Sequence, residues 1–447
     1  MGKEALAMSR YFENELIEQI KDANDIVSVI SEHVALKKRG KNYWGCCPFH
    51  NEKTPSFSVA PEKGFYYCFG CHASGNVIKF LMELEHLTFV EVLERLANRA
   101  NIPLPEAKLS PEQRARDKRR KKLYEACDLA ATFFHNCLTQ TSMGKVGLDY
   151  LKKRGLTKET IEQFKLGFAP DGWDKLYRAF HERGIDDSIL LELNLVRKNQ
   201  KGQFYDFFRN RIMFPIMDGK GRVVAFGGRV MDDSTPKYLN SPESSIFEKG
   251  KILFAFDKAY KSIRQERQAI LVEGYMDVIS AHNHGVTNVV ASLGTAYTRD
   301  HSHILMRQAD EIVLAYDMDG AGRQAAARAI ELLKNTDFKV RVLAMPDGKD
   351  PDDYIRNHGG QAFKDLVAKA VKPLDYLLSE SLIKHDTNDT EGKQAVMADV
   401  FPYIANIDSQ TQRDDALKTL ALPLWLDNSS IFRYFRDYVK KGQIELV

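Results

Sequence analysis

Residues 312–326 read IVLAYDMDGAGRQAA, an apolar run followed by two aspartates, a Gly-Ala-Gly turn and a helix-like pattern. The stretch could be a glycine-rich loop that cradles a phosphate, or a pair of carboxylates that holds a metal. Gly-x-Gly alone is a weak signal, because neither a complete dinucleotide-binding fingerprint nor a Gly-x4-Gly-Lys-Ser/Thr motif is present. Asp317 and Asp319 project to one side of an extended segment and can share a cation. We expect Gly320 and Gly322 to let the chain turn sharply beside that cation.

The segments on either side of this stretch alternate between strand-like and helix-like patterns. The strand-like runs are AILVE at 269–273, NVVASL at 288–293, EIVLAYD at 311–317 and KVRVLAM at 339–345. Helix-like patterns separate the runs, and this alternation predicts a parallel sheet with crossover helices. Ligand sites in such open sheets lie beyond the carboxyl ends of the strands.

Acidic side chains end or follow three of these four runs. Glu273 ends the first run and Asp277 follows it, Asp317 ends the third run and Asp319 follows it, and Asp350, Asp352 and Asp353 follow the fourth. Any one of them could instead be a helix cap. Their recurrence favours metal binding for Glu273, Asp317 and Asp319, since a phosphate loop would not need Glu273. Mg²⁺ prefers hard oxygen ligands and completes its shell with water and substrate phosphates.

A second candidate metal site lies in CCPFHNEKTPSFSVAPEKGFYYCFGC, residues 46–71. Two short pairs, Cys47-x2-His50 and Cys68-x2-Cys71, can supply the four N or S ligands of one tetrahedral, closed, structural Zn²⁺ site. Free thiols in a small core would leave the two pairs unexplained. Cys46 could replace Cys47 with one more intervening residue. His33 and His72 are further substitutes, each expected to be a bystander.

Cations and aromatic rings surround this cysteine and histidine motif. They are Lys37, Lys38, Arg39, Lys41, Tyr43, Trp44, Phe57, Phe65, Tyr66, Tyr67 and Phe69. Cations that follow a backbone, together with rings on which bases stack, are typical of single-stranded nucleic-acid binding. The alternative is that the rings pack the core of a small zinc domain, and we expect about half of them to do so.

The composition is that of a soluble globular protein. The 447 residues are 44% hydrophobic and 28% charged, with a formal net charge of +3, and the length predicts two to four domains of roughly 100–200 residues. No apolar run approaches the ~20 residues of a membrane span, and the N-terminus lacks the apolar segment of a signal peptide. We therefore expect a cytosolic protein, in which spaced cysteines bind metal rather than form disulfides.

Two further segments carry local predictions. RIMFPIM and RVVAFGGRV flank the turn Asp218–Gly221 and predict a β-hairpin. The run LSPEQRARDKRRKK at 109–122 has almost no apolar residue and is expected to be a linker or a solvated helix. A nuclear localisation signal is the alternative for such a basic cluster. From about Pro351 onward the patterns are mainly helical.

The motifs of the predicted sheet resemble a known fold. LVEGYMDV, VVASLGTA, YDMDGAGR and PDGKDPDDY look like the Toprim fold that bacterial primases, topoisomerases and some nucleases share. RNRIMFPI, VAFGGRV, TPKYLNSPE, CPFHNEKTPSF and FYYCFGC narrow the resemblance to bacterial DNA primases, from about residue 14 to the end. The resemblance implies synthesis of short RNA primers from ribonucleoside triphosphates on single-stranded DNA, at the replication fork.

The resemblance also implies an organisation: a multidomain α/β protein with a zinc ribbon, a mixed α/β subdomain, a Toprim parallel-sheet subdomain and a helical subdomain. The expected boundaries are 1–108 for the zinc-binding domain, 109–122 for the basic linker, 123–267 for the first α/β subdomain of the polymerase core, 268–354 for the Toprim subdomain and 355–447 for the helical subdomain. One structural zinc and catalytic Mg²⁺ or Mn²⁺ are the expected cofactors.

The resemblance also implies roles for individual residues. Glu273, Asp317 and Asp319 would be the core metal-binding acids, with Asp277, Asp350 and Asp352 in support. Arg154, Arg229 and Lys237 would form a basic surface that guides the template, and Arg209, Arg211, Tyr238, Asn240 and Lys249 would contact template or nucleotide. The family usually continues into a helicase-binding domain, and we expect this chain to lack it because it stops at Val447 without an evident counterpart.

Two other functions remain open from the sequence. The first is another Toprim enzyme, a topoisomerase or a nuclease. A topoisomerase needs a nucleophilic Tyr and a gate, for which no segment stands out. The second is a zinc protein that binds DNA without catalysis.

Overall fold

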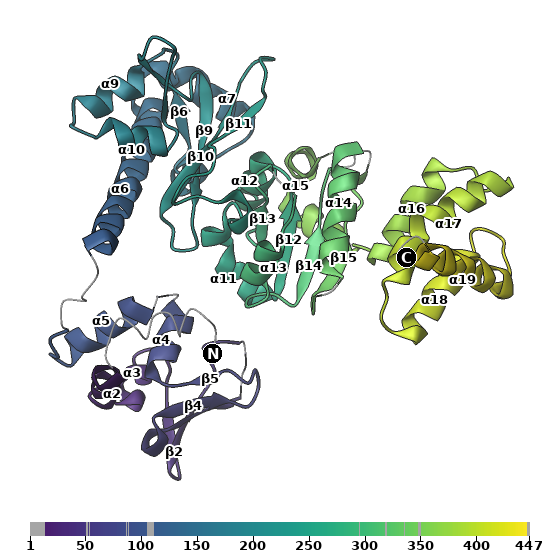
Figure 1. Ribbon diagram of the computed structural model, residues 1–447, viewed down its shortest axis with the longest axis horizontal. Helices are drawn as coiled ribbons and strands as arrows, with labels where there is room; N and C mark the ends of the chain where they lie inside the picture. The colour runs from purple at the N-terminus through teal and green to yellow at the C-terminus, as the bar shows by residue number, and fades with distance from the viewer. Residues whose placement is uncertain are drawn as a thin grey trace. The chain divides into compact units, whose positions relative to one another are not determined.

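The computed structural model describes residues 14–444 except 51, 53, 86, 88, 105–110, 295, 318–319, 335 and 347–349 (Figure 1). The chain divides into two compact units, residues 1–121 (unit 1) and residues 122–447 (unit 2). This division falls at the end of the predicted linker 109–122. The predicted boundaries at 267 and 354 both lie inside unit 2.

Unit 1 is built on an antiparallel sheet in the strand order β1-β2-β3-β4-β5. Its strands are β1 (Lys37–Arg39), β2 (Asn42–Gly45), β3 (Phe57–Ala60), β4 (Phe65–Cys68) and β5 (Ser74–Gly75). Its helices are α2 (Asn14–Asp22), α3 (Ile26–Ser31), α4 (Val77–Glu85) and α5 (Phe89–Arg99). Phe57, Tyr66 and Phe80 are fully buried, and the rings of Phe57 and Tyr66 stack with centroids 5.2 Å apart. Aromatic burial gives this small unit a core of its own.

The predicted linker forms the first part of a long helix, α6 (Pro111–Gln140). Residues 112–122 are exposed, and from Leu123 onward the helix contributes buried side chains such as Ala126 and Ala130. The change from charged to apolar residues at 122/123 explains why one face becomes buried only there. Of the two expected forms, linker or solvated helix, the structure has the solvated helix.

The first part of unit 2 surrounds a second antiparallel sheet in the order β11-β10-β9-β6. Its strands are β6 (Gly167–Ala169), β9 (Arg211–Met217), β10 (Val223–Arg229) and β11 (Tyr238–Asn240); β7 (Val196–Lys198) and β8 (Phe204–Asp206) pair separately. Its helices include α7 (Lys145–Lys153), α8 (Lys158–Gln163), α9 (Lys175–His181) and α10 (Asp187–Glu192). The predicted hairpin is confirmed, because β9 and β10 pair antiparallel across the turn at 218–221.

The predicted parallel sheet is also confirmed, in the order β13-β12-β14-β15 with every pairing parallel. Its strands are β12 (Gln268–Val272), β13 (Val289–Ala291), β14 (Glu311–Leu314) and β15 (Lys339–Val342), and its helices are α11 (Phe256–Glu266), α12 (Tyr275–Asn283), α13 (Arg299–Leu305) and α14 (Gly320–Leu333). Strand side chains alternate between the faces. Ile270 and Val272 join the core shared with the antiparallel sheet, whereas Ala269 and Leu271 pack in a second core beside α11, α13 and α14.

The chain ends in helices, as predicted. They are α15 (Pro351–Ala368), α16 (Pro373–Lys384), α17 (Thr390–Ala405), α18 (Gln410–Ala421) and α19 (Asn428–Ile444). Helix α15 is interrupted at Gly359, where φ is 83°, and it packs on α12 beside the parallel sheet. Helices α16 to α19 share a hydrophobic core that includes Val400 and Leu420. None of the helices in the described part of the chain is long and apolar enough to cross a membrane.

Candidate functional site

The four expected zinc ligands lie together in unit 1. Cys47 follows β2, Cys68 ends β4, and Cys71 lies in the turn before β5, so two strand ends bring the pairs to one point. One ligand atom from each of Cys47, His50, Cys68 and Cys71 lies within 4.8 Å of all the others. Cys47 Sγ is 3.7 Å from Cys71 Sγ, and His50 Nδ1 is 3.7 Å from Cys68 Sγ. Such spacing fits the four-coordinate sites of small metal ions.

A carboxylate that the sequence argument did not consider supports this cluster. Glu52 accepts a hydrogen bond from the Cys47 amide at 2.6 Å, and its other oxygen lies 3.3 Å from His50 Nε2. Burial alone would raise the pKa of Glu52, but hydrogen bonds from Ser56 and Cys47 and the nearby His50 hold the pKa below its ordinary value. A carboxylate on the second ring nitrogen fixes the orientation of a ligand histidine. The signal available in the sequence is the acid two residues after His50.

The substitutes considered from the sequence lie outside the cluster. Cys46 is exposed, whereas its neighbour Cys47 is buried. The Nδ1 atom of His72 lies 2.8 Å from the hydroxyl oxygen of Tyr67, and the ring of His33 packs 6.0 Å from that of Phe80. The structure therefore brings together the ligand set with the tighter Cys-x2-His spacing.

The aromatic rings near the cluster divide between core and surface. Phe57 and Tyr66 are buried, whereas Phe69 is 61% exposed and its ring stacks on Trp44 with centroids 5.7 Å apart. Strand β1 is exposed along its whole length, and Lys38 Nζ lies 5.9 Å from the centre of the Tyr43 ring. This arrangement of exposed rings beside cations is one that can stack bases and neutralise phosphates.

Two of the three core acids meet at the carboxyl edge of the parallel sheet. Glu273 follows β12 and Asp317 lies three residues beyond β14, the neighbouring strand. The Asp317 amide donates a hydrogen bond to Glu273 Oε1 at 3.1 Å. The third core acid, Asp319, lies outside the described residues. Parallel strands that end at one edge explain how residues 44 positions apart come into contact.

Gly322 has a different role from the one expected. A Cβ atom at this position would lie 2.5 Å from Glu273 Oε1 and would also overlap the carbonyl oxygen of Asp317. At Gly320, nothing would lie within 4 Å of an added Cβ. Gly322 is therefore required because the first turn of α14 lies directly against the acids, rather than because the chain turns there.

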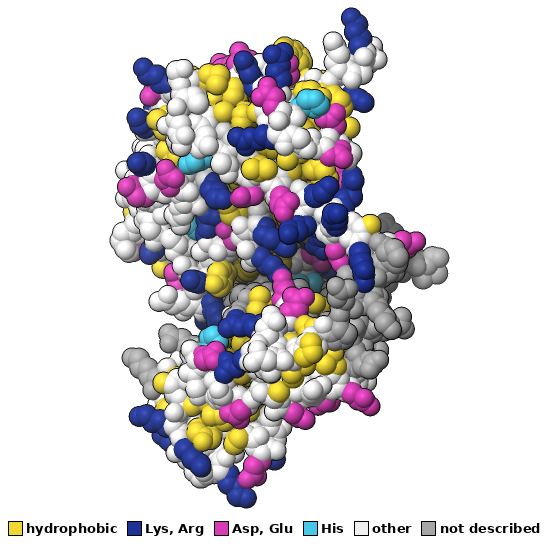
Figure 2. Space-filling view, turned by 90° about the vertical axis from the view of Figure 1, so that its left-hand side faces the viewer, with side chains coloured by type: hydrophobic (Ala, Val, Ile, Leu, Met, Phe, Trp, Pro, Cys, Tyr) yellow, Lys and Arg dark blue, Asp and Glu magenta, His cyan; other side chains and the backbone are white. Residues whose placement is uncertain are grey.

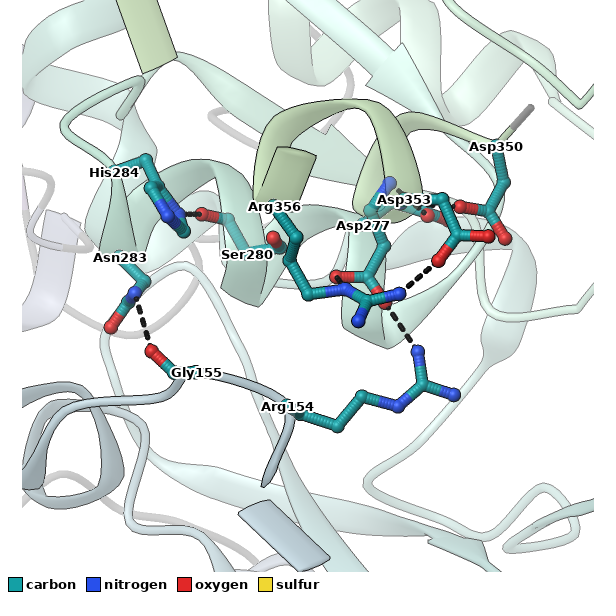
Figure 3. Close-up of polar contacts among 10 residues, drawn as sticks. Arg154, Gly155, Asp277, Ser280, Asn283, His284, Asp350, Asp353 and Arg356 are labelled. Atoms are coloured by element: carbon teal, nitrogen blue, oxygen red, sulfur yellow. Dashed lines mark hydrogen bonds and ion pairs between the residues drawn. The ribbon is translucent and has the colours of Figure 1, made fainter. Parts of the chain in front are cut away.

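The supporting acids form a second group around the start of α15 (Figure 3). Asp277 accepts hydrogen bonds from the amides of Gly274 at 2.9 Å and Asp352 at 3.2 Å. Asp350 is the N-cap of α15 and accepts from the Asp353 amide at 2.6 Å. The helix-cap alternative therefore describes real contacts of Asp277 and Asp350, and capping leaves other carboxylate lone pairs available.

Asp352 is held between two arginines. Its side chain accepts a hydrogen bond from Arg154 at 2.7 Å, and Arg356 Nε lies 3.2 Å away, while Arg356 also pairs with Asp353. Asp352 is only 2% exposed. The pair with Arg154 joins the loop after α7 to α15. The same loop is fixed a second time through Asn283, whose amide nitrogen donates to the Gly155 carbonyl at 3.2 Å (Figure 3).

The carboxylates near the start of α15 raise one another's pKa values. Burial, and then the charges of Asp317, Asp350 and Asp352, raise the pKa of Asp277 well above its ordinary value. Burial and the neighbouring acids Asp353 and Asp352 also raise the pKa of Asp350. Within the described residues, the acids do not form a second group of three whose ligand atoms converge as the cysteine and histidine ligands do. A bound cation would offset the repulsion between such acids.

The residues expected to contact nucleic acid are divided by their burial. Arg211 is 8% exposed and its Nη1 donates to the Pro236 carbonyl at 2.9 Å, so it holds β11 in place. Asn240 donates to the Leu293 carbonyl at 3.0 Å and accepts from the Tyr275 hydroxyl at 2.8 Å. The contacts of these two residues are therefore with the protein, and they stabilise the fold around the site.

Other members of the set differ in their exposure. Arg229 is 7% exposed; its guanidinium carbon lies 5.2 Å from the centre of the Tyr150 ring and 5.5 Å from that of Tyr238, and its buried Nε and Nη1 have no hydrogen-bond partner among the described residues. Burial raises the pKa of Tyr238 to about 12, so its hydroxyl is a donor at neutral pH. Lys237 is exposed and Lys249 is partly exposed.

Arg209 belongs to a surface that the sequence did not predict. Its guanidinium lies 4.3 Å from the centre of the exposed Trp173 ring, and the Tyr205 ring is inclined to that ring by 67° with centroids 6.0 Å apart. Stacked cation and aromatic groups offer a platform for a base. Trp173 is more than 30 positions before Tyr205 on β8 and Arg209 just after it, so no short motif could have indicated the group.

Comparison with known proteins finds family matches for the zinc cluster, the first α/β subdomain and the parallel sheet. Residues 12–112 match the CHC2 zinc finger, 133–260 the DNA primase catalytic core N-terminal domain, and 270–355 the Toprim-like family. The chain is 42% identical over 443 residues to the DNA primase of Halalkalibacterium halodurans, covering 98% of this chain and 74% of that one. It is 41% identical over 439 residues to the DNA primase of Escherichia coli K12, covering 97% and 74%.

The chain belongs to the DNA primase family. Solved structures of primases have the same fold. The Aquifex aeolicus primase with its zinc-binding and RNA polymerase domains is similar at a TM-score of 0.59 and 32% identity, over 93% of this chain and 98% of that one. A primase domain from Pseudomonas aeruginosa is similar at a TM-score of 0.62 and 37% identity, over 70% of this chain and 99% of that one. Membership of the family makes the chain a nucleotidyltransferase, and it gives no support to a topoisomerase, a nuclease or a non-catalytic zinc protein.

One expectation was wrong. Residues 374–422 match the DnaB-helicase binding domain of primase, so this primase has the domain that its C-terminal sequence was expected to lack. The segment corresponds to α16, α17 and α18. Its helical patterns were recognised in the sequence, but amphipathic helices carry no short motif that identifies a binding partner.

Proposed function

We propose that the chain synthesises short RNA primers from ribonucleoside triphosphates on single-stranded DNA, at the replication fork in the bacterial cytoplasm. The observation that carries the proposal is the contact between Glu273 and Asp317 at the carboxyl edge of the parallel sheet. Edges of this kind are where open α/β sheets bind their ligands. Membership of the primase family and the basic residues on the neighbouring subdomain support the same reaction.

Glu273, Asp317 and Asp319 would hold the catalytic Mg²⁺ or Mn²⁺, since carboxylate oxygens are the ligands that these ions prefer. When bound, two such ions stabilise the attacking and the departing oxygens of a phosphoryl transfer. Asp277, Asp350 and Asp352 add negative charge nearby and fix the first turn of α15. No side chain stands out as the only general base, and Glu273 is suited either to accept a proton or to bind metal.

The basic and aromatic residues of the first α/β subdomain would bind template and nucleotide. Arg229 is buried beside the ring of Tyr238, so it would attract the template through its positive charge. Arg154, Lys237 and Lys249 would add charge along the same path. Arg211 and Asn240 would keep the strand that carries Tyr238 in place, and Arg209 would present its stack with Trp173 to a base.

The cluster of Cys47, His50, Cys68 and Cys71 would hold one structural Zn²⁺. The fit rests on three sulfur ligands and one nitrogen ligand within 4.8 Å, with Glu52 behind the histidine. All four positions are filled by protein atoms, so the ion would shape the domain rather than react. Trp44 and Phe69 beside it would contribute to the choice of start site, and identical start sites after deletion of residues 1–108 would contradict this part.

Helices α16 to α18 would contact a DnaB-type helicase. The match at 374–422 supports the partner. Directly beyond α18, Leu422 is 77% exposed and Trp425 is 87% exposed, and exposed large apolar side chains are typical anchors of protein interfaces. Capture of a purified DnaB-type helicase by the wild type, reduced at least about tenfold by Trp425→Ala, tests this contact.

Primer synthesis separates the proposal from its alternatives. The wild type should synthesise short RNA when it is incubated with single-stranded DNA, labelled ribonucleotides and Mg²⁺ or Mn²⁺. Asp317→Ala should lower the yield by about 10³-fold or more, because a lost metal ligand removes several kcal/mol of charge stabilisation. Asp149→Ala, an exposed acid on α7, is the matched control. Synthesis by Asp317→Ala at the wild-type rate would contradict the proposed site.

A further inference from the structure

The start of α6 is a strongly basic segment that the sites described above do not use. We call residues 112–122 the basic arm. Seven of its eleven residues are cationic and two are acidic, a formal net charge of +5, against +3 for the whole chain. The cations are Arg114, Arg116, Lys118, Arg119, Arg120, Lys121 and Lys122. The remaining residues therefore sum to −2, so the net positive charge of the chain comes from the arm.

Every residue of the basic arm is exposed. Figure 2 faces the side of the molecule that carries α6 and shows Lys and Arg side chains gathered near its middle. The helix then continues without a break into the core of unit 2, where Leu123 and Cys127 are buried. The arm is thus joined to the catalytic unit by helical hydrogen bonds, and its length is about 16 Å at 1.5 Å per residue.

Like charges outnumber opposite charges at helical spacing in the arm. Its i and i+4 pairs include three like-charged ones, at 114/118, 116/120 and 118/122, and two opposite ones, at 112/116 and 117/121, and like-charged pairs destabilise a helix. Polyanion binding relieves this repulsion and releases the counterions that are condensed on the polyanion. Two effects therefore favour binding to a polyanion: the repulsion within the arm falls, and counterions leave the polyanion.

The composition of the arm also restricts the type of partner. Ala115 is its one apolar residue, and it has no aromatic residue. Protein interfaces depend on large apolar or aromatic anchors, and reading of bases depends on stacking rings or on specific hydrogen bonds. A surface with cations alone fits the phosphate backbone of a nucleic acid.

We propose that the basic arm, on the helix that continues into the catalytic unit, binds the backbone of the single-stranded DNA template without sequence preference. The proposal rests on the proposed function, since a primase acts on such a template. Each phosphate that a cation neutralises contributes about 0.7 to the slope of log K against log salt for a single strand. The contribution of the arm is therefore measurable as a change in salt dependence.

The test compares two variants of the full chain that remove the same number of charges. The arm variant carries Arg114→Gln, Arg116→Gln, Lys118→Gln and Lys122→Gln. The control variant carries Lys364→Gln, Lys369→Gln, Arg433→Gln and Arg436→Gln, at exposed positions of the C-terminal helices. Fluorescence anisotropy with labelled oligo-dT of about 30 nucleotides, between about 50 and 200 mM salt, gives the affinity and its salt slope.

The arm variant should bind oligo-dT about tenfold or more weakly than wild type, and its slope should be smaller by about 1.5–3. The control variant should match wild type. Equal losses in both variants, or an arm variant with wild-type affinity and slope, would overturn the proposal. A mixed-sequence oligonucleotide should show the same loss, and a loss confined to one sequence would also contradict it. Asp317→Ala should keep the wild-type slope while losing primer synthesis, so the two proposals fail independently.

Discussion

The two candidate metal centres collect their ligands in opposite ways. In unit 1, three cysteines and a histidine converge within 4.8 Å on two strand ends. At the edge of the parallel sheet, Glu273 and Asp317 are bridged by a backbone amide, and Asp352 is held by arginines. Thiols and imidazole can be neutral and can therefore lie together, whereas carboxylates repel one another unless a cation lies between them. The strands alone bring the ligands of the first site together, whereas the acids of the second site need a bound cation to come together.

The largest effect should come from removing a ligand of the converged site. Cys68→Ser should abolish zinc binding by unit 1, and β3 and β4 should lose their protection from hydrogen exchange, because structural zinc contributes directly to the folding of small domains. Metal content by mass spectrometry and hydrogen exchange are the measurements. Cys46→Ser, which changes the neighbouring exposed thiol, should retain the metal. Loss of metal in Cys46→Ser would mean that the structure brings together the wrong cysteine.

At the acidic edge the corresponding test changes the backbone rather than a ligand. Gly322→Ala should reduce primer synthesis by about 10²-fold. The added Cβ would lie 2.5 Å from Glu273 Oε1, which is too close, so the carboxylate would have to move. Gly320→Ala in the same motif meets no atom within 4 Å and should stay within about twofold of wild type. Equal effects of the two substitutions would show that the motif needs flexibility rather than close approach.

A smaller effect is expected from the carboxylate behind the zinc ligands. Glu52→Gln should weaken metal binding by about 10–100-fold, because the glutamine cannot hold His50 by charge. Competition with a chromophoric chelator measures this affinity. Glu62→Gln, at an exposed position of the same unit, should have no effect. Wild-type affinity in Glu52→Gln would indicate that the strands alone align the histidine.

The smallest effect concerns the pH dependence of stability in the absence of divalent cations. The pKa of Asp277 is raised by burial and by its acidic neighbours, so the folded chain binds this proton more tightly than the unfolded chain. Wild type should therefore lose stability, relative to Asp277→Asn, as the pH rises above the ordinary aspartate pKa of about 4. Below that pH both states are protonated, and the difference between the two proteins should stop changing with pH.

Thermal unfolding between pH 4 and 7 provides the measurement, with the difference in melting temperature expected to shift by about 2–4 °C in favour of Asp277→Asn over this range. Asp149→Asn is exposed and should follow wild type throughout. A wild type that becomes more stable than Asp277→Asn as the pH rises would contradict the raised pKa. Addition of Mg²⁺ should reduce the advantage of Asp277→Asn, whereas it should leave the zinc unit unaffected.

Short-range signals explain what the sequence could predict. The two Cys and His pairs, the hairpin at 218–221 and the four parallel strands each depend on spacing within a few residues, and spacing is visible in the chain. The contact between Arg154 and Asp352 joins residues 198 positions apart, so no local pattern reports it. The same applies to the burial of Arg211 and to the stack of Arg209 on Trp173. The role of Gly322 depended on how closely a helix approaches a neighbouring strand end.

The hydrophobic core that passes from the antiparallel sheet to the parallel sheet determines where the protein can be cut. A fragment that began at residue 268 would leave Ile270 and Val272 without the residues that cover them in this core. Such a fragment would present an apolar face to water and would be prone to aggregate. The two units have separate cores, and α6 runs unbroken from Pro111 into unit 2. For protein production, the catalytic region is therefore best expressed as one piece from residue 111 onward, so that α6 stays whole.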